Sequence, residues 1–195
     1  ALDIGFVPGK GGKDASGMMG AMDVLFLAGA DGLSSEKIGS AFVVYMGTHG
    51  DNGAHRADVI LPGSAYTEKS GTYVNTEGRV QMTTRAGFAP GDAKEDWAIL
   101  RALSDVLGKK LPFDSLGQLR AALYAEYPHL AALGTVKAGS ADDVANAAKL
   151  GGRINKAPFK GAVTDFYLTN PIARASAVMA ECSALAKGGF RQAAE

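Results

Sequence analysis

Three short apolar runs, separated by segments rich in glycine and polar residues, constrain the fold of this 195-residue chain more than any other feature. The runs are VLFLA at residues 24–28, AFVVYM at 41–46 and ADVIL at 57–61. Continuous apolar runs like the first two are typical of strands buried on both faces, and their repetition across short connections predicts parallel strands. We also expect a short helix at residues 34–40 and a polar loop at 47–56. The pattern predicts an α/β fold with a parallel sheet.

The middle of the chain changes character after the third run. Residues 63–89 alternate Thr, Tyr and Val with repeated glycine, which predicts extended segments joined by tight turns. A helix follows, in which Asp92 and Glu95 have the spacing of an N-terminal cap pair and Gly108 marks the end. Its expected apolar face, from residues spaced three and four apart, contains Ile99, Leu100, Leu103, Val106 and Leu107.

Three more helices are predicted in the second half. One begins near Asp114 or Ser115, with Gln118 in the reciprocal capping position, and one spans residues 140–150. The last begins at Asn170-Pro171, because asparagine caps helices and proline fits their first turn, and it ends at Gly188-Gly189. The expected apolar faces are Leu116, Leu119 and Leu123 in the first of these helices and Ile172, Ala175, Met179 and Cys182 in the last.

Charge and cysteine content exclude several classes of protein. Twenty basic residues balance twenty acidic ones, so no net field attracts nucleic acid or anionic lipid. The longest apolar run, near residues 24–30, is far shorter than the ~20 residues that cross a bilayer. Cys182 is the single cysteine, which excludes an internal disulfide and an iron–sulfur cluster held by this chain's own thiolates. We interpret it as a buried, inert thiol.

Two glycine-rich motifs invite comparison with phosphate-binding loops. In GFVPGKG at residues 5–11, three residues separate Gly5 from Gly9 and glycine follows Lys10, whereas the phosphate loop needs four intervening residues and a Ser or Thr. Gly29-Ala30-Asp31-Gly32 follows a predicted strand, where α/β proteins bind phosphates. It is shorter than the dinucleotide fingerprint, so a tight turn is the favoured interpretation.

The polar loop at residues 47–56 offers His49, Asp51 and His55 as candidate metal ligands. No helix is expected to set their spacing and no cysteine is near, so turns and local hydrogen bonds are favoured and no metal site is predicted. The chain also contains no G-x-S-x-G elbow and no convincing Ser–His–Asp or Cys–His set. We therefore predict no catalytic residue.

Residues 57–81, ADVILPGSAYTEKSGTYVNTEGRVQ, have the wording of a known signature. The segment resembles one in molybdopterin-dependent oxidoreductases. LPGSAYTEKSGTYVNTEGR is more closely similar to the large iron–sulfur subunit (75 kDa type) of respiratory complex I. Other blocks that resemble this family, in the same order, are ALDIGFVPG (1–9), VLFLAGADG (24–32), GTHGDNGAHRADVILPG (47–63), EDWAILRALSDVLGKKLPFDSLGQLR (95–120) and DFYLTNPIARASAVMAEC (165–182).

The resemblance implies a fold and a division of the chain. Residues 1–135 are expected to form a Rossmann-like parallel sheet portion of a molybdopterin-oxidoreductase-like domain, and residues 136–195 a connector and a C-terminal helical segment. The chain begins within a motif that lies far from the amino end in the family. We therefore expect the carboxyl-terminal part of a longer polypeptide, which completes its core against the rest of its subunit or another chain.

The resemblance also implies a role as a structural and assembly segment of NADH:quinone oxidoreductase, which passes electrons from NADH to quinone and pumps ions. This type of subunit is generally understood to lack a working molybdenum site, and its cluster ligands lie in its amino-terminal region. No bound cofactor is therefore expected here. The implied partners are the rest of the same polypeptide and the other subunits of the peripheral arm. The implied location is the cytoplasmic side of a bacterial inner membrane, or the matrix side in a mitochondrion.

Two alternatives remain open from the residues. The chain could be a fragment of a true molybdopterin-dependent oxidoreductase of the formate-dehydrogenase type, or an independent nucleotide-binding module. In the first case the polar members of the signature are pterin contacts; in the favoured interpretation they form a turn network around Glu77 and Gly78. The remnant cofactor-binding candidates are Gly29, Asp31, Gly32, Glu68, Asn75 and Arg79.

Overall fold

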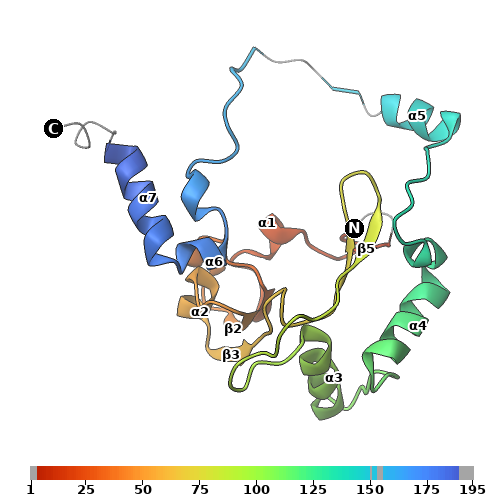
Figure 1. Ribbon diagram of the computed structural model, residues 1–195, viewed down its shortest axis with the longest axis horizontal. Coiled ribbons are helices and arrows are strands. Elements are labelled where there is room, and N and C mark those ends of the chain that lie inside the picture. Colours follow the sequence, from red (N-terminus) through yellow and green to blue (C-terminus); the bar gives the residue numbers. More distant parts are fainter. Residues whose placement is uncertain (1–3, 150, 153–155, 189–195) are drawn as a thin grey trace.

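A computed structural model describes residues 4–149, 151–152 and 156–188 of the chain. Its centre is a three-stranded parallel sheet of β1 (Val24–Ala28), β2 (Phe42–Gly47) and β3 (Val59–Pro62), in the order β1-β2-β3 (Figure 1). Val24 pairs with Phe42, and Val44 pairs with Val59. The predicted α/β fold with parallel strands is therefore confirmed.

One face of the sheet holds the hydrophobic core. The connection from β1 to β2 contains a 3-10 turn, η1 (Ser35–Ile38), and the connection from β2 to β3 contains α2 (Asn52–Arg56). Both connections pack on the same face, as does α1 (Ala15–Met18). The polar loop predicted at residues 47–56 is therefore helical in its second half. The core residues are Leu25, Leu27, Ile38, Ala41, Val43 and Tyr45.

Burial in β1 alternates, so the predicted burial of this strand on both faces is wrong. Leu25 and Leu27 are buried, whereas Val24 and Phe26 remain half exposed on the opposite face. The apolar run did indicate a strand, but nothing among the described residues covers that second face at this point. The central strand β2 does match the expectation, because four consecutive residues from Val43 are buried.

A β-hairpin follows the sheet. Strands β4 (Thr72–Val74) and β5 (Val80–Met82) pair antiparallel, which confirms the predicted extended segments and tight turn. Gly78 adopts a φ of 82° in the turn, a backbone conformation that glycine adopts without strain. The amide of Gly134 donates to the carbonyl of Val80 at 2.7 Å, so the hairpin is tied to a much later part of the chain.

The two predicted helices after the hairpin are present as α3 (Asp96–Val106) and α4 (Leu116–Glu126), with a 3-10 turn, η2 (Pro128–Ala131), after them. Gly108 ends α3 with a φ of 69°, and the amide of Lys109 donates to the carbonyl of Ser104 at 2.9 Å. This is the Schellman arrangement expected of a C-terminal glycine. Ser115 caps α4 as predicted, accepting from the Gln118 amide.

Two details of these helices differ from expectation. Glu95 is the N-cap residue of α3 but makes no capping hydrogen bond; its carboxylate instead accepts from the Trp97 indole at 2.9 Å. Asp92 lies in the preceding turn, so the predicted cap pair does not form. The last turn of α3 extends into solvent, which leaves Val106 and Leu107 exposed rather than on a buried face.

The second half of the chain is more open. Helix α5 (Ala141–Ala148) begins with a capping box between Ser140 and Asp143. It stands apart from the sheet in Figure 1, and an extended segment leads back to η3 (Phe166–Leu168), α6 (Pro171–Arg174) and α7 (Ala177–Gly188). The helix predicted at residues 140–150 is thus confirmed over the part that the structure describes; Leu150 and Gly189 lie outside the described residues.

The helix predicted to run unbroken from Asn170 is two helices. Asn170 caps α6 as expected, with its side-chain oxygen accepting from the amide of Ala173 at 2.9 Å. Ser176 then accepts from the amide of Met179 at 3.3 Å and so starts α7 as a second cap. The predicted buried stripe is wrong in consequence: Ile172, Ala175 and Met179 are exposed, and only Cys182 is partly buried.

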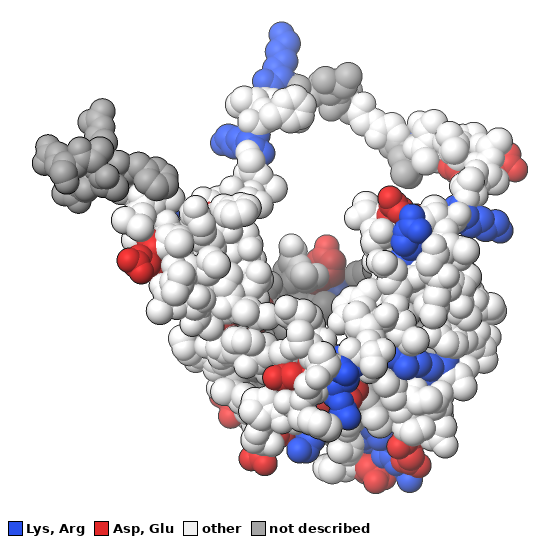
Figure 2. All heavy atoms as spheres, in the orientation of Figure 1, with Lys and Arg blue, Asp and Glu red and all other residues white. Residues whose placement is uncertain are grey.

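No helix in the described part of the chain has both the length and the apolar character needed to span a membrane. On the face seen in Figure 2, acidic and basic side chains are interspersed over the body of the molecule rather than gathered into one patch. The predicted division of the chain at residues 135 and 136 stays a prediction.

Candidate functional site

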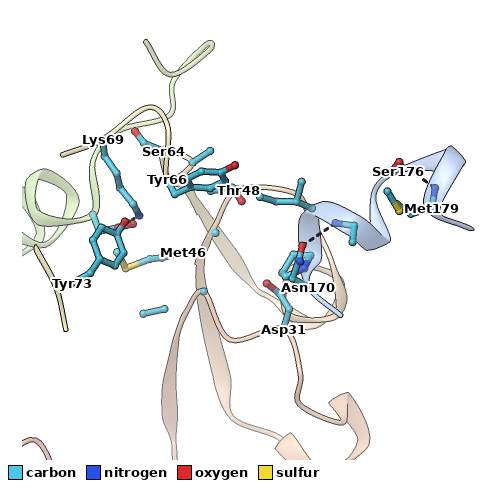
Figure 3. A pocket seen from close by; sticks show the side chains of 18 of the residues that line it. Asp31, Met46, Thr48, Ser64, Tyr66, Lys69, Tyr73, Asn170, Ser176 and Met179 are labelled. Carbon is cyan, nitrogen blue, oxygen red and sulfur yellow. Dashed lines mark hydrogen bonds and ion pairs between the residues drawn. The ribbon is translucent and has the colours of Figure 1, made fainter. Parts of the chain in front are cut away.

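A cleft of about 870 Å³ lies at the carboxyl ends of the parallel strands. Ligands of open parallel sheets bind at this edge, because the connecting loops leave a crevice there. Loops after β1 and β2 form one side through Gly29 and Thr48, and the segment after β3 contributes Ser64. Helices α3, α6 and α7 close the other sides. Figure 3 shows Lys69 and Tyr73 opposite Asn170 and Asp31 across this space.

Asp31 is the most deeply buried carboxylate of the cleft, with 4% of its surface exposed. One oxygen accepts from the Tyr45 hydroxyl at 2.9 Å and the other from the Gly53 amide at 3.2 Å, in the first turn of α2. Burial, and then the hydrogen bond to Asp31, raise the pKa of Tyr45 far above its usual range. The buried carboxylate therefore connects the turn after β1 to β2 and to α2.

The motif Gly29-Ala30-Asp31-Gly32 forms the tight turn that carries this carboxylate. Gly29 has a φ of 62°, and its amide donates to the carbonyl of Met46 at 2.7 Å. Gly29 and Asp31 both line the cleft. The Asp31 carboxylate is hydrogen-bonded to Tyr45 and Gly53, however, so the turn has a structural role: it holds this carboxylate against β2 and α2.

Tyr45 explains two glycines, Gly47 at the end of β2 and Gly53 in α2. A Cβ on Gly47 would lie 2.0 Å from the Tyr45 hydroxyl oxygen, and one on Gly53 would lie 2.7 Å from the ring. Such contacts are far inside van der Waals distance, so only glycine fits at either position while Tyr45 keeps its place. The glycines thus serve the packing of a buried aromatic side chain.

The candidate metal ligands predicted within residues 47–56 have other partners or positions. Asp51 forms an ion pair with Arg174 of α6, 123 residues away in the chain. The Nδ1 atom of His49 lies 2.6 Å from the Thr48 hydroxyl, and His55 belongs to α2. Over the residues that the structure describes, no three His, Cys, Asp or Glu side chains are grouped as a metal site would need.

The polar members of the signature fall into two groups. Glu68 accepts from the amide of Ala65 at 2.9 Å and shapes the loop at the edge of the cleft. Asn75 and Arg79 lie in the hairpin and are not among the residues that line the cleft. The side-chain oxygen of Asn75 accepts from the amides of Glu77 and Arg79 at 3.0 and 2.9 Å.

Arg79 ties the hairpin to distant chain as well as to its own turn. Its guanidinium donates to the carbonyl of Gly134 at 2.9 Å and to Glu77 at 3.1 Å. These contacts match the turn network favoured from the sequence. The assignment of Glu68, Asn75 and Arg79 as remnant cofactor-binding candidates stays a prediction.

An ion pair between Lys69 and Asp96 borders the cleft and was missed in the sequence. The two residues are 27 positions apart, and no local pattern connects them. Among the described residues, the charged ones that line the cleft are Asp31, Lys69 and Asp96, so two negative charges face one positive charge. A molybdopterin cofactor carries phosphate, and this charge balance opposes a polyanion. The expectation that no cofactor is bound here stays a prediction.

Comparison with known proteins gives two family matches. The molybdopterin oxidoreductase family matches residues 1–106. The family of the C-terminal region of the NADH-ubiquinone oxidoreductase G subunit matches residues 132–182. Together they cover the sheet, the residues that line the cleft, and the C-terminal helices as far as residue 182 in α7.

Individual relatives agree with these families. The chain is 48% identical over 163 residues to the NADH-ubiquinone oxidoreductase 75 kDa subunit of Reclinomonas americana, covering 84% of this chain and 23% of the relative. It is 43% identical over 188 residues to NADH dehydrogenase [ubiquinone] iron-sulfur protein 1, mitochondrial, of Solanum tuberosum, covering 96% and 25%. The Neurospora crassa 78 kDa subunit is 45% identical over 170 residues, covering 85% and 23%. The chain thus spans about a quarter of each relative.

Proposed function

The chain belongs to the molybdopterin oxidoreductase family, and on that premise we propose that it is a scaffolding segment of the large iron–sulfur subunit of NADH:ubiquinone oxidoreductase. The observation that carries this proposal is the identity of 43–48% to relatives named as 75 kDa, 78 kDa or iron–sulfur subunits of that enzyme. The match of residues 132–182 to the second family supports the same placement. In this role the segment supports electron transfer from NADH to quinone without carrying electrons itself.

The hydrogen bonds of the cleft support a scaffolding role over a cofactor-binding one. Its two carboxylates, Asp31 and Asp96, are each engaged by a partner within the protein. Polar groups that are already paired with one another stabilise the loops that carry them, and they are not available to bind a ligand. We propose that the cleft is a remnant of the family's cofactor crevice, kept because its loops hold α6 and α7 on the sheet.

The proposal assigns the redox centres to the rest of the polypeptide. Iron–sulfur clusters require several cysteine thiolates, and this chain contains one cysteine. Cys182 is only partly buried in α7 and does not line the cleft. We propose that clusters are bound by residues outside this segment, and that other subunits of the peripheral arm pack against it on the matrix or cytoplasmic side of the inner membrane.

None of the three relatives described above is named as a formate dehydrogenase. The charge of the cleft gives no support to that alternative either, because a polyanionic pterin would face a net negative lining. A second function is therefore not advanced.

The test is purification of the full-length polypeptide, with an affinity tag, from membranes of its source. We expect flavin- and cluster-containing subunits to co-purify, with NADH:quinone reductase activity. Deleting residues 132–182 from the tagged polypeptide should abolish assembly, and a matched deletion confined to residues 136–139 should not. A tagged protein that is isolated alone, or that assembles normally without residues 132–182, would contradict the scaffolding role. Molybdenum or tungsten at one atom per polypeptide would contradict the assignment of the cleft as a remnant.

A further inference from the structure

A second, smaller pocket lies beside the cleft and shares Lys69, Tyr73 and Asp96 with it. Its volume is about 400 Å³, within the range of ~300–1,000 Å³ that is typical of small-molecule sites. The walls are residues 69–73, the start of α3 at residues 95–97, and one face of α4. That face, set by spacings of three and four along the helix, consists of Leu116, Leu119, Arg120 and Leu123. We call this space the Arg120 pocket.

Arg120 is the charged residue of this pocket that has no partner within the part of the chain that the structure describes. Its side chain is half-buried, and the Nη2 atom is buried without a hydrogen-bond acceptor. The other charged residues of the lining are engaged: Lys69 pairs with Asp96, and Glu95 accepts from the Trp97 indole at 2.9 Å. A buried charged donor without an acceptor is costly, and it calls for an explanation such as a bound ion.

The rest of the lining decides which anion suits the Arg120 pocket. Tyr73, Trp97 and the three leucines of α4 make most of the remaining wall apolar. Glu95 and Asp96 line the same pocket, so their carboxylates disfavour a ligand group with two negative charges, such as phosphate. A guanidinium can donate two parallel hydrogen bonds to one carboxylate. The chemistry therefore favours a ligand with one carboxylate and an apolar body.

We infer that the Arg120 pocket binds a small monocarboxylate. Its carboxylate pairs with the Arg120 guanidinium, and its apolar body packs on Trp97 and the leucines of α4. Because Arg120 lines the pocket on a long side chain, rotation about the terminal bonds is enough to present Nη2 to the ligand. Binding at this site goes beyond the scaffolding role and does not depend on which complex the polypeptide joins.

The experiment is titration of 4-fluorobenzoate into the purified full-length polypeptide, followed by fluorine NMR. We expect saturable binding by the wild type and a loss of affinity of about tenfold or more in Arg120→Gln. Arg120→Lys should lose less, because it keeps the charge but not the paired donors. Lys110→Gln is the matched control and should bind as the wild type does, since Lys110 is exposed and does not line the pocket. The uncharged 4-fluorobenzamide should bind about tenfold more weakly than the benzoate, or less tightly still.

A second measurement separates ligand binding from a purely structural role of Arg120. Arg120→Met replaces an unpaired charge with an apolar side chain of similar length, so amide hydrogen exchange in α4 should be no faster than in the wild type. Adding 4-fluorobenzoate should slow exchange in α4 of the wild type and leave it unchanged in Arg120→Met.

Four results would overturn the inference. The first is the absence of saturable benzoate binding to the wild type, and the second is equal affinity in Arg120→Gln. The third is tighter binding of inorganic phosphate than of 4-fluorobenzoate, because it would show that the carboxylate assignment is wrong. The fourth is faster exchange in α4 of Arg120→Met without ligand, because it would show that the guanidinium is held by another group of the full-length protein.

Discussion

The hydroxyl of Tyr45, in the central strand, donates a hydrogen bond of 2.9 Å to the carboxylate of Asp31, in the turn after the neighbouring strand. The other carboxylate oxygen accepts from the amide of Gly53, at the start of α2. Both side chains are almost fully buried. A carboxylate in such a place is costly unless its oxygens are hydrogen-bonded, so this pair determines how the loops of the cleft are arranged.

Replacing Tyr45 with phenylalanine removes one donor and leaves Asp31 buried with one bond fewer. We expect the free energy of unfolding to fall by about 1–3 kcal/mol, measured by denaturant titration. The pKa of Tyr45 is raised above its ordinary value of 10.0, so the stabilisation is complete below pH 10 and is lost as the pH rises towards the folded-state pKa. The difference between wild type and Tyr45→Phe should therefore be constant below pH 10 and shrink above it. A difference that grows above pH 10 would contradict this account.

Replacing Gly47 with alanine should destabilise the protein more than its size suggests. The new Cβ would lie 2.0 Å from the Tyr45 hydroxyl oxygen, so the ring must move and its bond to Asp31 must break. We expect a loss of at least about 2 kcal/mol in the free energy of unfolding. Gly32→Ala is the matched control, because no heavy atom lies within 4 Å of its Cβ, and it should change stability by less than about 0.5 kcal/mol. Equal effects of the two substitutions would refute the packing argument.

Replacing Arg174 with methionine should loosen α6 and α7 from α2. Arg174 pairs with Asp51 and also donates to the carbonyl of Leu168 at 3.1 Å. We expect amide hydrogen exchange in α7 to accelerate, with a local loss of about 1–3 kcal/mol, while exchange in β2 stays as in the wild type. Arg85→Met is the control: its pair with Glu95 spans 3.8 Å and the Arg85 side chain is exposed, and ion pairs with an exposed partner contribute about 1 kcal/mol or less. Unchanged exchange in α7 of the Arg174 variant would contradict the role of this ion pair.

Lowering the pH should destabilise the packing of α7, because it protonates Asp165. Hydrogen bonds from Lys187 and then Ser183, at 2.7 and 2.5 Å, lower the pKa of Asp165 below its ordinary 3.8. A lowered pKa means that the stabilisation is complete above the ordinary value and is lost as the pH falls through the folded-state pKa. We expect protection of α7 from exchange, corrected for the intrinsic pH dependence, to fall below pH 3.8. Asp165→Asn should remove this dependence and Asp142→Asn, on α5, should keep it; a pH dependence unchanged in the first variant would refute the assignment.

Local signals in the sequence located most elements correctly. The three apolar runs became three parallel strands, and Ser115, Ser140 and Asn170 cap the helices that they were predicted to start. The break between α6 and α7 also has a local signal in the sequence, the capping residue Ser176. The apolar spacing across the break nevertheless predicted a single helix. Spacing alone does not reveal a second cap when both halves have helical periodicity.

What the sequence by itself determined about this protein is its family and the order of its strands, caps and turns, because these depend on residues within a few positions of one another. The tertiary structure alone decided that Asp31 meets Tyr45, that Asp51 meets Arg174 across 123 residues, and that Phe26 and Phe42 stay half exposed on the face of the sheet opposite the core. A run of apolar residues predicts a strand that is buried in the folded protein. It does not show which part of the structure covers the strand, because burial depends on everything packed around the strand and not on the strand's own residues.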